Sequence, residues 1–242
     1  MVARNSCRAA RGVRPSRGWH VRTALFAAAL VIPTLLTGSA ELASAANTVL
    51  VSKGQGGAPA NGTSSIGVVA KGGRYVTFTS AASNLVSGDT NGTEDIFVRD
   101  LLTGAIERVS VSSSGGQSND QSQVPDISAD GRLVAFWSAA TNLVANDTNG
   151  VPDVFVHDRL NHTTERVSVD LLGGEANGES WGASVSGDGR YVSFCSDASN
   201  LVSGDVNGAM DAFVRDRTLG TTIRASVSSS GIEGNGRSCM NS

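Results

Sequence analysis

The strongest constraint on the fold is a motif that the chain repeats three times at constant spacing. "SGDTNGTEDIFVRD" begins at residue 87, "ANDTNGVPDVFVHD" at 145 and "SGDVNGAMDAFVRD" at 203, so each copy starts 58 residues after the last. The flanking sequence keeps the same phase, as in "GGRYVTFTSAASNLV" at 72, "DGRLVAFWSAATNLV" at 130 and "DGRYVSFCSDASNLV" at 188. A fixed period of this kind indicates a repeat architecture, in which each unit packs on its neighbours.

Each unit contains four segments that read as strands. In the middle unit these segments are 125–128, 133–138, 153–158 and 165–170, all rich in Val, Ile or Phe and bounded by turn residues. Asp130-Gly131, between the first two, is a hairpin signal. In 133–138 apolar side chains fall on both faces, so each sheet needs a neighbour on either side. We therefore expect an all-β fold, a β-propeller of 58-residue four-stranded blades, with a β-helix or solenoid as the alternative.

The motif S-x-D-G-R-x-V-x-F-x-S followed by D-x-F-V-x-D resembles the WD40-like (PD40) β-propeller repeat of TolB-type proteins. The middle unit carries it at Ser128, Asp130, Gly131, Arg132, Val134, Phe136 and Ser138, then at Asp153, Phe155, Val156 and Asp158. The third unit matches equally well, whereas the first departs from the motif at Ala70 and Gly72. The resemblance implies the propeller fold. It implies little about function, because propellers support many unrelated activities.

The blades are expected at about 66–111, 124–169 and 182–227, with partial units at either end. Closed propellers usually contain about four to eight blades. The sequence therefore predicts an open or truncated propeller, or copies that associate to close a ring. Exposed sheet faces at the open blade edges would favour self-association.

The first 45 residues have the pattern of a signal peptide. Arginines precede the apolar run "TALFAAALVIPTLL", and "ASA" at 43–45 is a cleavage pattern. We expect a secreted, extracellular protein in which 46–242 carries the propeller repeats; an uncleaved anchor is the alternative. Two cysteines then remain, Cys195 and Cys239, which form either a disulfide or two buried free thiols.

The long loop between the second and third strands of each unit contains D-x-N-G-x-x-D. Ca²⁺ prefers several hard oxygen ligands, and Gly permits the sharp turn that such a loop needs. The candidate ligands of a structural Ca²⁺ are Asp89, Asn91 and Asp95, then Asp147, Asn149 and Asp153, then Asp205, Asn207 and Asp211. The match is partial, because an earlier acidic position of such loops falls on Ser87, Ala145 and Ser203. A metal-free Asn-Gly turn is the alternative.

The other repeated polar residues indicate architecture. Asp100, Asp158 and Asp216 are expected to cap turns, and Arg74, Arg132 and Arg190 to pair with a repeated aspartate. Leu85, Leu143 and Leu201 are expected to anchor the long loops under the blades. His157 replaces Arg99 and Arg215 of its sister units, which suggests an interchangeable surface position.

The sequence contains no established catalytic motif. A formal net charge of −3 offers no electrostatic case for a nucleic-acid partner. We expect a secreted, non-enzymatic binding or scaffold protein without catalytic residues, whose partner is a protein or a glycan. The alternatives are a propeller-fold hydrolase or lyase with its active centre in the central channel, and a truncated fragment without independent function. The expected innermost strands, "IGVVA", "PDIS" and "ASVS", carry small side chains and favour the first interpretation.

Overall fold

The computed structural model describes residues 48–239, and within this range the fold is all-β. Twelve strands form three antiparallel four-stranded sheets, each in chain order. The first sheet contains β1 (Ser64–Val69), β2 (Tyr75–Ser80), β3 (Asp95–Asp100) and β4 (Ile106–Arg108). The second contains β5 (Ser122–Ile127), β6 (Leu133–Ser138), β7 (Asp153–Asp158) and β8 (Thr163–Arg166). The third contains β9 (Ser180–Val185), β10 (Tyr191–Ser196), β11 (Asp211–Asp216) and β12 (Thr221–Arg224).

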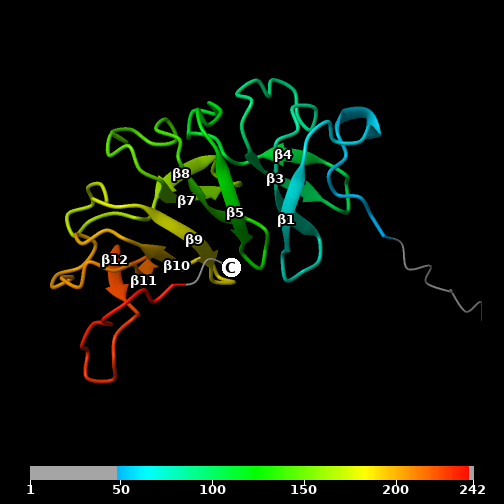
Figure 1. Ribbon diagram of the computed structural model, residues 1–242. Helices are drawn as coiled ribbons and strands as arrows, with labels where there is room; N and C mark the ends of the chain where they lie inside the picture. The colour runs from blue at the N-terminus through cyan, green and yellow to red at the C-terminus, as the bar shows by residue number, and fades with distance from the viewer. Residues whose placement is uncertain (1–47, 240–242) are drawn as a thin grey trace, which may run out of the picture. The chain divides into compact units, whose positions relative to one another are not determined.

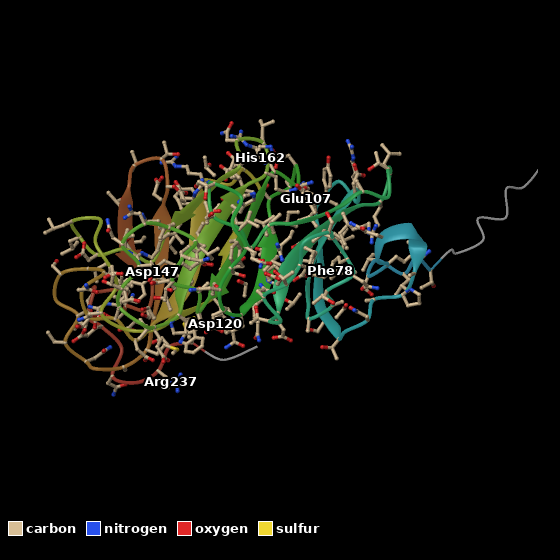
Figure 2. All side chains as sticks on the ribbon, turned by 90° about the horizontal axis from the view of Figure 1, so that it is seen from above. Phe78, Glu107, Asp120, Asp147, His162 and Arg237 are labelled. Carbon is tan, nitrogen blue, oxygen red and sulfur yellow. A yellow bond between two sulfur atoms is a disulfide. The ribbon has the colours of Figure 1, made fainter. Side chains whose placement is uncertain are left out.

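The three sheets are the blades of an open propeller, as the repeat predicts. Their first strands, β1, β5 and β9, follow one another along the inner side, and β4, β8 and β12 lie outermost (Figure 1). Hairpin ends gather at opposite edges of the blades, with Glu107 and His162 at one edge and Asp120 and Arg237 at the other (Figure 2). The predicted signal peptide lies outside the described residues. Within 48–239 no helix is long and apolar enough to cross a membrane.

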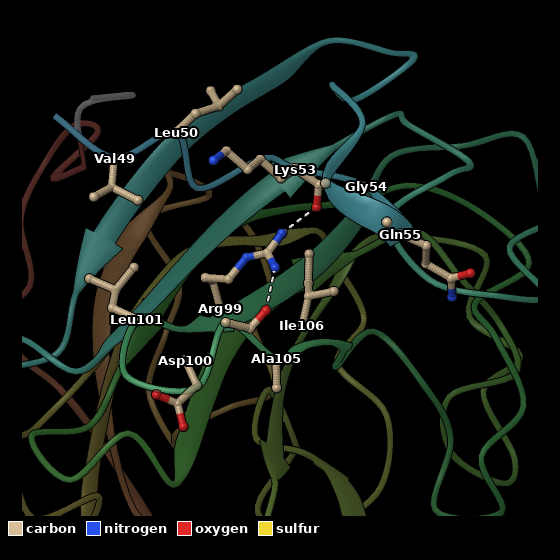
Figure 3. A pocket seen from close by; sticks show the side chains of 13 residues that line it. Val49, Leu50, Lys53, Gly54, Gln55, Arg99, Asp100, Leu101, Ala105 and Ile106 are labelled. Carbon is tan, nitrogen blue, oxygen red and sulfur yellow. Dashed lines mark hydrogen bonds between the residues drawn. The ribbon is translucent and has the colours of Figure 1, made fainter.

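The segment before β1 covers the face of the first blade that points away from the second blade. Val51 packs on Phe78 and Phe97 there, as Val109 packs at the next boundary, 58 residues later. Arg99 fixes the segment, because its guanidinium donates to the carbonyl oxygen of Val51. It also donates to the carbonyl oxygen of Lys53 (Figure 3). Residues 48–52, in the partial unit at the N-terminal end of the repeats, form no strand. The short bridge between Lys53 and Pro59 instead repeats the one between Val111 and Gln117.

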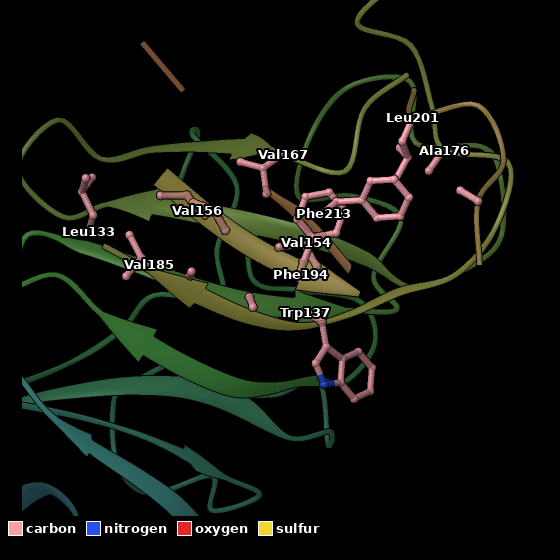
Figure 4. Packing of buried hydrophobic residues seen from close by; sticks show 14 residues of the cluster. Leu133, Trp137, Val154, Val156, Val167, Ala176, Val185, Phe194, Leu201 and Phe213 are labelled. Atoms are coloured by element: carbon pink, nitrogen blue, oxygen red, sulfur yellow. The ribbon is translucent and has the colours of Figure 1, made fainter. Parts of the chain in front are cut away.

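Apolar clusters fill the spaces between neighbouring blades. The cluster between the second and third blades takes side chains from β6 and β7 on one side and from β9, β10 and β11 on the other (Figure 4). A stacked phenylalanine pair recurs inside each sheet, with ring centroids 5.9 Å apart for Phe78 and Phe97, 6.1 Å for Phe136 and Phe155, and 5.8 Å for Phe194 and Phe213. Each fully buried phenylalanine contributes about 1.5–3 kcal/mol through removal of apolar surface from water.

The predicted Asp-Gly turns also set how closely the blades approach. Gly131 has a φ of 77°, a left-handed conformation that side-chain-bearing residues rarely adopt. A Cβ added there would lie 2.1 Å from the ring of Tyr75 in the preceding blade. Gly189 meets Leu133 of the second blade in the same way. The glycine of each turn is therefore a contact point between blades as well as a hairpin residue.

The predicted boundaries of the first and fourth strands of the middle unit need correction. The fourth strand of the middle unit occupies 163–166 instead of 165–170, because a tight turn capped by Asp158 starts it early. The first strand begins at Ser122 instead of at 125. A shift in register between Gln123 and Asp126 accommodates Pro125, which has no N–H to donate, and lets pairing continue beyond it.

Of the two alternatives for Cys195 and Cys239, the structure has the disulfide, with their Cα atoms 6.0 Å apart. Other expectations are confirmed. The three loop leucines, Leu85, Leu143 and Leu201, are buried under the blades. Arg74, Arg132 and Arg190 pair with Asp100, Asp158 and Asp216, and each of these aspartates also accepts backbone N–H groups of the following turn.

Candidate functional site

The structure brings together the candidate ligands of each acidic loop, and it places an arginine between them. In the middle unit, Nη1 of Arg166 lies 3.2 Å from a carboxylate oxygen of Asp147, 3.2 Å from one of Asp153 and 3.2 Å from one of Glu175. Arg166 comes from β8, which pairs with β7, the strand that begins at Asp153. The outer hairpin therefore delivers a cation to the loop.

The second carboxylate of the motif has its hydrogen bonds satisfied by the protein. Oδ1 of Asp153 accepts a hydrogen bond of 2.5 Å from Ser168, and Oδ2 accepts one of 2.9 Å from the Asn149 amide. Asp153 is fully buried. These bonds offset much of the cost of removing the carboxylate from water, because a buried charge is tolerated when it is paired and hydrogen-bonded.

The same arrangement recurs in the other two units. Arg108 lies 3.1 Å from Asp89 and 3.3 Å from Asp95, whereas Arg224 lies 3.1 Å from Asp205 and 3.5 Å from Asp211. Asn91 and Asn207 donate to the second aspartate of their loops, at 2.9 Å and 2.8 Å. All nine predicted ligand residues thus belong to three equivalent arginine-centred clusters.

This donor set does not fit Ca²⁺ as it is arranged. The ion requires about six to eight oxygen ligands, whereas here a guanidinium lies between the carboxylates and each asparagine presents an amide N–H₂ to an aspartate. Among residues 48–239 no group of three His, Cys, Asp or Glu side chains is placed to hold a metal ion. The geometry favours the metal-free turn, and calcium binding stays a prediction.

The clusters carry more negative than positive charge, and this shifts the pKa values of their aspartates. Burial and the nearby charge of Asp153 raise the pKa of Asp147 to about 6. Burial also raises the pKa of Asp89 and of Asp205. The opposite shift occurs at the exposed clamps, where the hydrogen bond from Arg132 holds the pKa of Asp158 well below its usual range. The two kinds of aspartate therefore respond to acid in opposite ways.

We expect the Asp147→Asn variant to change how stability depends on pH. Because the folded-state pKa of Asp147 is raised, its contribution is fully present below about pH 4 and is lost as pH rises through about 6. The thermal midpoint of the wild type should therefore fall more steeply over this interval than that of the variant. Asp158→Asn is the matched control, since its stabilisation should disappear only as pH falls below about 4. Parallel curves for wild type and Asp147→Asn would contradict the assigned shift.

The interpretation of His157 as a surface position is wrong. Its side chain is buried, its Nδ1 lies 2.9 Å from the hydroxyl of Thr164, and burial lowers its pKa to about 4. The loop that follows the first blade covers this part of β8, since Ser113 accepts a hydrogen bond from the Thr164 N–H. A comparison of equivalent residues in the repeat could not reveal this burial, because the residues that cover His157 belong to the neighbouring blade. His157 is a neutral packing residue.

A pocket of about 460 Å³ was missed by the sequence analysis. It lies where β9 begins and β10 ends, and it is lined chiefly by Trp137, Trp181, Glu179, Asp197, Met210 and Arg237. We call it the tryptophan pocket. The two indole rings meet edge to face, with centroids 5.2 Å apart. The Trp181 indole N–H is buried and has no hydrogen-bond acceptor among the described residues.

The tail of the chain forms one wall of the tryptophan pocket. The disulfide joins Cys239 to Cys195, which is the cross-strand neighbour of Trp181. Ser238 donates its N–H to the Met210 carbonyl at 2.9 Å, and the Arg237 guanidinium contacts the Met210 sulfur at 3.3 Å. The disulfide and these two polar contacts therefore hold residues 237–239 in place beside the pocket.

A signal for this pocket was present in the sequence, as departures from the repeat. Trp181 takes the place of Ser65 and Gln123, and Asp197 takes the place of Ala81 and Ala139. Glu179 takes the place of Thr63 and Gln121, and Met210 that of Glu94 and Pro152. The expected third blade omitted Trp181 because its start was placed at 182, whereas β9 begins at Ser180.

No protein-family model and no curated protein matches the chain. Among solved structures it is similar to TolB from Acinetobacter baumannii, with 19% identity over 71% of this chain and 34% of that chain and a TM-score of 0.43. A putative TolB from Agrobacterium tumefaciens gives 18% identity, 64% and 46% coverage, and a TM-score of 0.42. The third is the β-propeller domain of the Trilobed protease from Pyrococcus furiosus, described as having an open velcro topology. It has 15% identity over 68% of this chain and 42% of that chain, with a TM-score of 0.41.

The chain spans about a third of the length of the Acinetobacter protein. The fold described above rests on the sheets and their register, and these similarities carry no functional assignment.

Proposed function

We propose that this chain is an exported, non-enzymatic propeller that works as a binding and assembly module. The observation that carries the proposal is the outer face of the third blade, which is built like an inter-blade surface but has no blade against it in the described structure. We call it the blade-3 face and define it by Tyr191, Ala212, Val214, Ile223 and Val227. The partner that we assign to it is a second copy of this chain, which packs a sheet against this face.

Equivalent positions in the other two blades support this assignment. Leu133, at the position of Tyr191, is 8% exposed, whereas Tyr191 is 40% exposed. Val154 and Val156 are fully buried against the third blade, whereas Ala212 and Val214 are only half-buried. Sheets with two apolar faces need a neighbour on each side, and an apolar patch of this kind marks an interaction surface.

A break in the repeat on this face makes it more apolar than its counterparts. Glu107 and Glu165 form ion pairs with Arg159 and Arg217 of the following blade. The third unit has Ile223 at this position, and its side chain is 61% exposed. An isoleucine suits a dry contact better than the charged bridge it replaces.

The repeated acidic residues support the non-enzymatic part of the proposal. Each aspartate of the loops and clamps contacts an arginine of its own blade, so none is left as a free acid or base. On the inner strand β5, Asp126 accepts hydrogen bonds from the Ser184 hydroxyl and the Val185 N–H of the next blade. Such a carboxylate joins blades and is not available for chemistry in a central channel.

Sedimentation equilibrium of 46–242 tests the assembly. We expect a concentration-dependent dimer that Val214→Lys weakens at least about tenfold, because a lysine in the centre of an apolar contact loses hydration without a partner. Leu102→Lys is the control, since Leu102 is exposed on the first blade, away from this face. A monomer at all concentrations, or equal dimerisation of the two variants, would overturn the proposal.

A further inference from the structure

We propose that the tryptophan pocket is a binding site for a neutral sugar and accommodates a pyranose ring of an oligosaccharide. This inference rests on residues other than those that define the blade-3 face, and the two meet only where Cys195 of the pocket pairs with Ala212 of that face. It extends the proposed function by adding a small-molecule ligand to an assembly module.

The position of the pocket coincides with a break in the repeat. Trp181, Asp197 and Met210 differ in kind from both sister residues at their positions, and the fold places all three around one cavity. Residues that serve the propeller architecture recur in every unit, as the phenylalanine pairs and arginine clusters do. Residues that occur once and converge on one cavity are expected to serve a ligand.

The chemistry of the lining matches a ligand that both donates and accepts hydrogen bonds. Glu179 and Asp197 offer carboxylate acceptors, whereas Arg237 and the Trp181 indole N–H offer donors. Sugar hydroxyls can satisfy both kinds of group at once. The apolar C–H face of a pyranose can pack on an indole ring, which supplies a large apolar surface with a polar edge.

The donors distinguish a sugar from an organic cation. Two indoles near a right angle, with an interplanar angle of 69°, together with carboxylates could also surround a quaternary ammonium group. Such a cation accepts no hydrogen bond, so the Trp181 N–H would stay without an acceptor and the Arg237 charge would be repelled. The mixed lining therefore favours the neutral polyhydroxyl ligand.

The pocket is shaped before any ligand arrives. Val124 and Gly182, at equivalent positions on β5 and β9, have φ values of 50° and 63° where each strand shifts register. A β-branched residue in this conformation is an uncommon outlier, and such strain is concentrated at functional sites. Both residues line the pocket, and the disulfide joins Cys195, which also lines it, to the tail.

Tryptophan fluorescence gives a direct test, because Trp137 and Trp181 are the only tryptophans after Trp19 of the predicted signal peptide. Emission of 46–242 therefore reports the tryptophan pocket alone. The probes are cellobiose, maltose and N,N′-diacetylchitobiose, with choline chloride as the cationic comparison. We expect a saturable change in emission with at least one disaccharide and a Kd on the order of 0.1–1 mM, because few polar groups converge on the cavity.

The variants restore residues that the sister units already carry, so the sheets tolerate them. Trp181→Gln and Asp197→Ala should each weaken binding about tenfold or more, while Trp137 remains as the fluorescent reporter. Leu219→Asn is the matched control. It also installs the middle unit's residue, but at the far end of β11, and should bind as the wild type does.

Each contrary result is decisive. If none of the three disaccharides changes the emission, the sugar assignment is wrong. If choline alone saturates, the pocket takes a cation instead. If Trp181→Gln binds with wild-type affinity, the ligand lies elsewhere. A monomeric but sugar-binding protein would overturn only the proposed assembly, so the two proposals fail separately.

Discussion

Replacing Arg166 with methionine is expected to lower the free energy of unfolding by about 3–5 kcal/mol, since removal of one partner leaves buried charges uncompensated. Arg166 is the cation shared by Asp147, Asp153 and Glu175. Methionine keeps the apolar stem of the side chain but removes every hydrogen-bond donor. Urea denaturation at neutral pH measures the loss as a shift of the midpoint at unchanged slope.

The control for this variant is Arg132→Met, which removes an arginine of the exposed clamp with Asp158. The Arg132 side chain is 41% exposed, and exposed ion pairs contribute roughly 0–1 kcal/mol. The two variants delete the same chemical group from the same blade, so the difference between them isolates burial. A loss below about 1 kcal/mol for Arg166→Met would show that the cluster does not depend on its arginine.

The urea denaturation of Arg166→Met can also be compared with and without added Ca²⁺. With the guanidinium removed, the carboxylates of Asp147, Asp153 and Glu175 face one another without a cation. Added Ca²⁺ should then raise the midpoint of Arg166→Met more than that of the wild type. A wild-type shift corresponding to about 2.7 kcal/mol, the value for a ligand at 100 times its Kd, would support the calcium prediction and contradict the arginine-centred interpretation.

The repeat period made most of the fold predictable. Strands that carry the phase, such as 133–138 and 153–158, were placed correctly because short apolar runs bounded by turn residues are local signals. A repeated aspartate was also expected as the partner of Arg132, and the structure identifies it as Asp158. Boundaries failed where a bulge was involved, as at Gln123, because the ladder continues past a proline that the sequence pattern treats as a stop.

The candidate site was predicted only in part. The aspartates were found, but the arginine at their centre was not, although Arg108, Arg166 and Arg224 keep the same phase. The link is tertiary: strand pairing of β7 with β8 brings Arg166 back to the loop that precedes β7. The burial of His157 failed for a related reason, because loops of another unit cover it. Contacts between strands and between units are not encoded in the composition of one loop.

Loss of the disulfide is expected to have the second-largest effect. Cys195 and Cys239 are 44 residues apart, and a bridge over a loop of this length typically contributes about 2–4 kcal/mol, chiefly by restricting the unfolded chain. The Cys195→Ser/Cys239→Ser double variant should therefore unfold at a lower urea concentration than the oxidised wild type. Wild-type protein under reducing conditions is the matched comparison, because it loses the bond but keeps both sulfur atoms.

The double cysteine variant also shows whether the disulfide stabilises the whole fold or only holds the tail in place. If the bridge mainly restricts the unfolded state, the whole transition shifts and the native tryptophan emission stays as it is. If it mainly holds the tail, Arg237 and Ser238 leave Met210, water reaches the indoles, and emission moves to longer wavelength before unfolding begins. Because the tail forms one wall of the tryptophan pocket, this second outcome would make ligand binding sensitive to reduction. An unchanged midpoint and an unchanged emission after reduction would show that the bond contributes to neither.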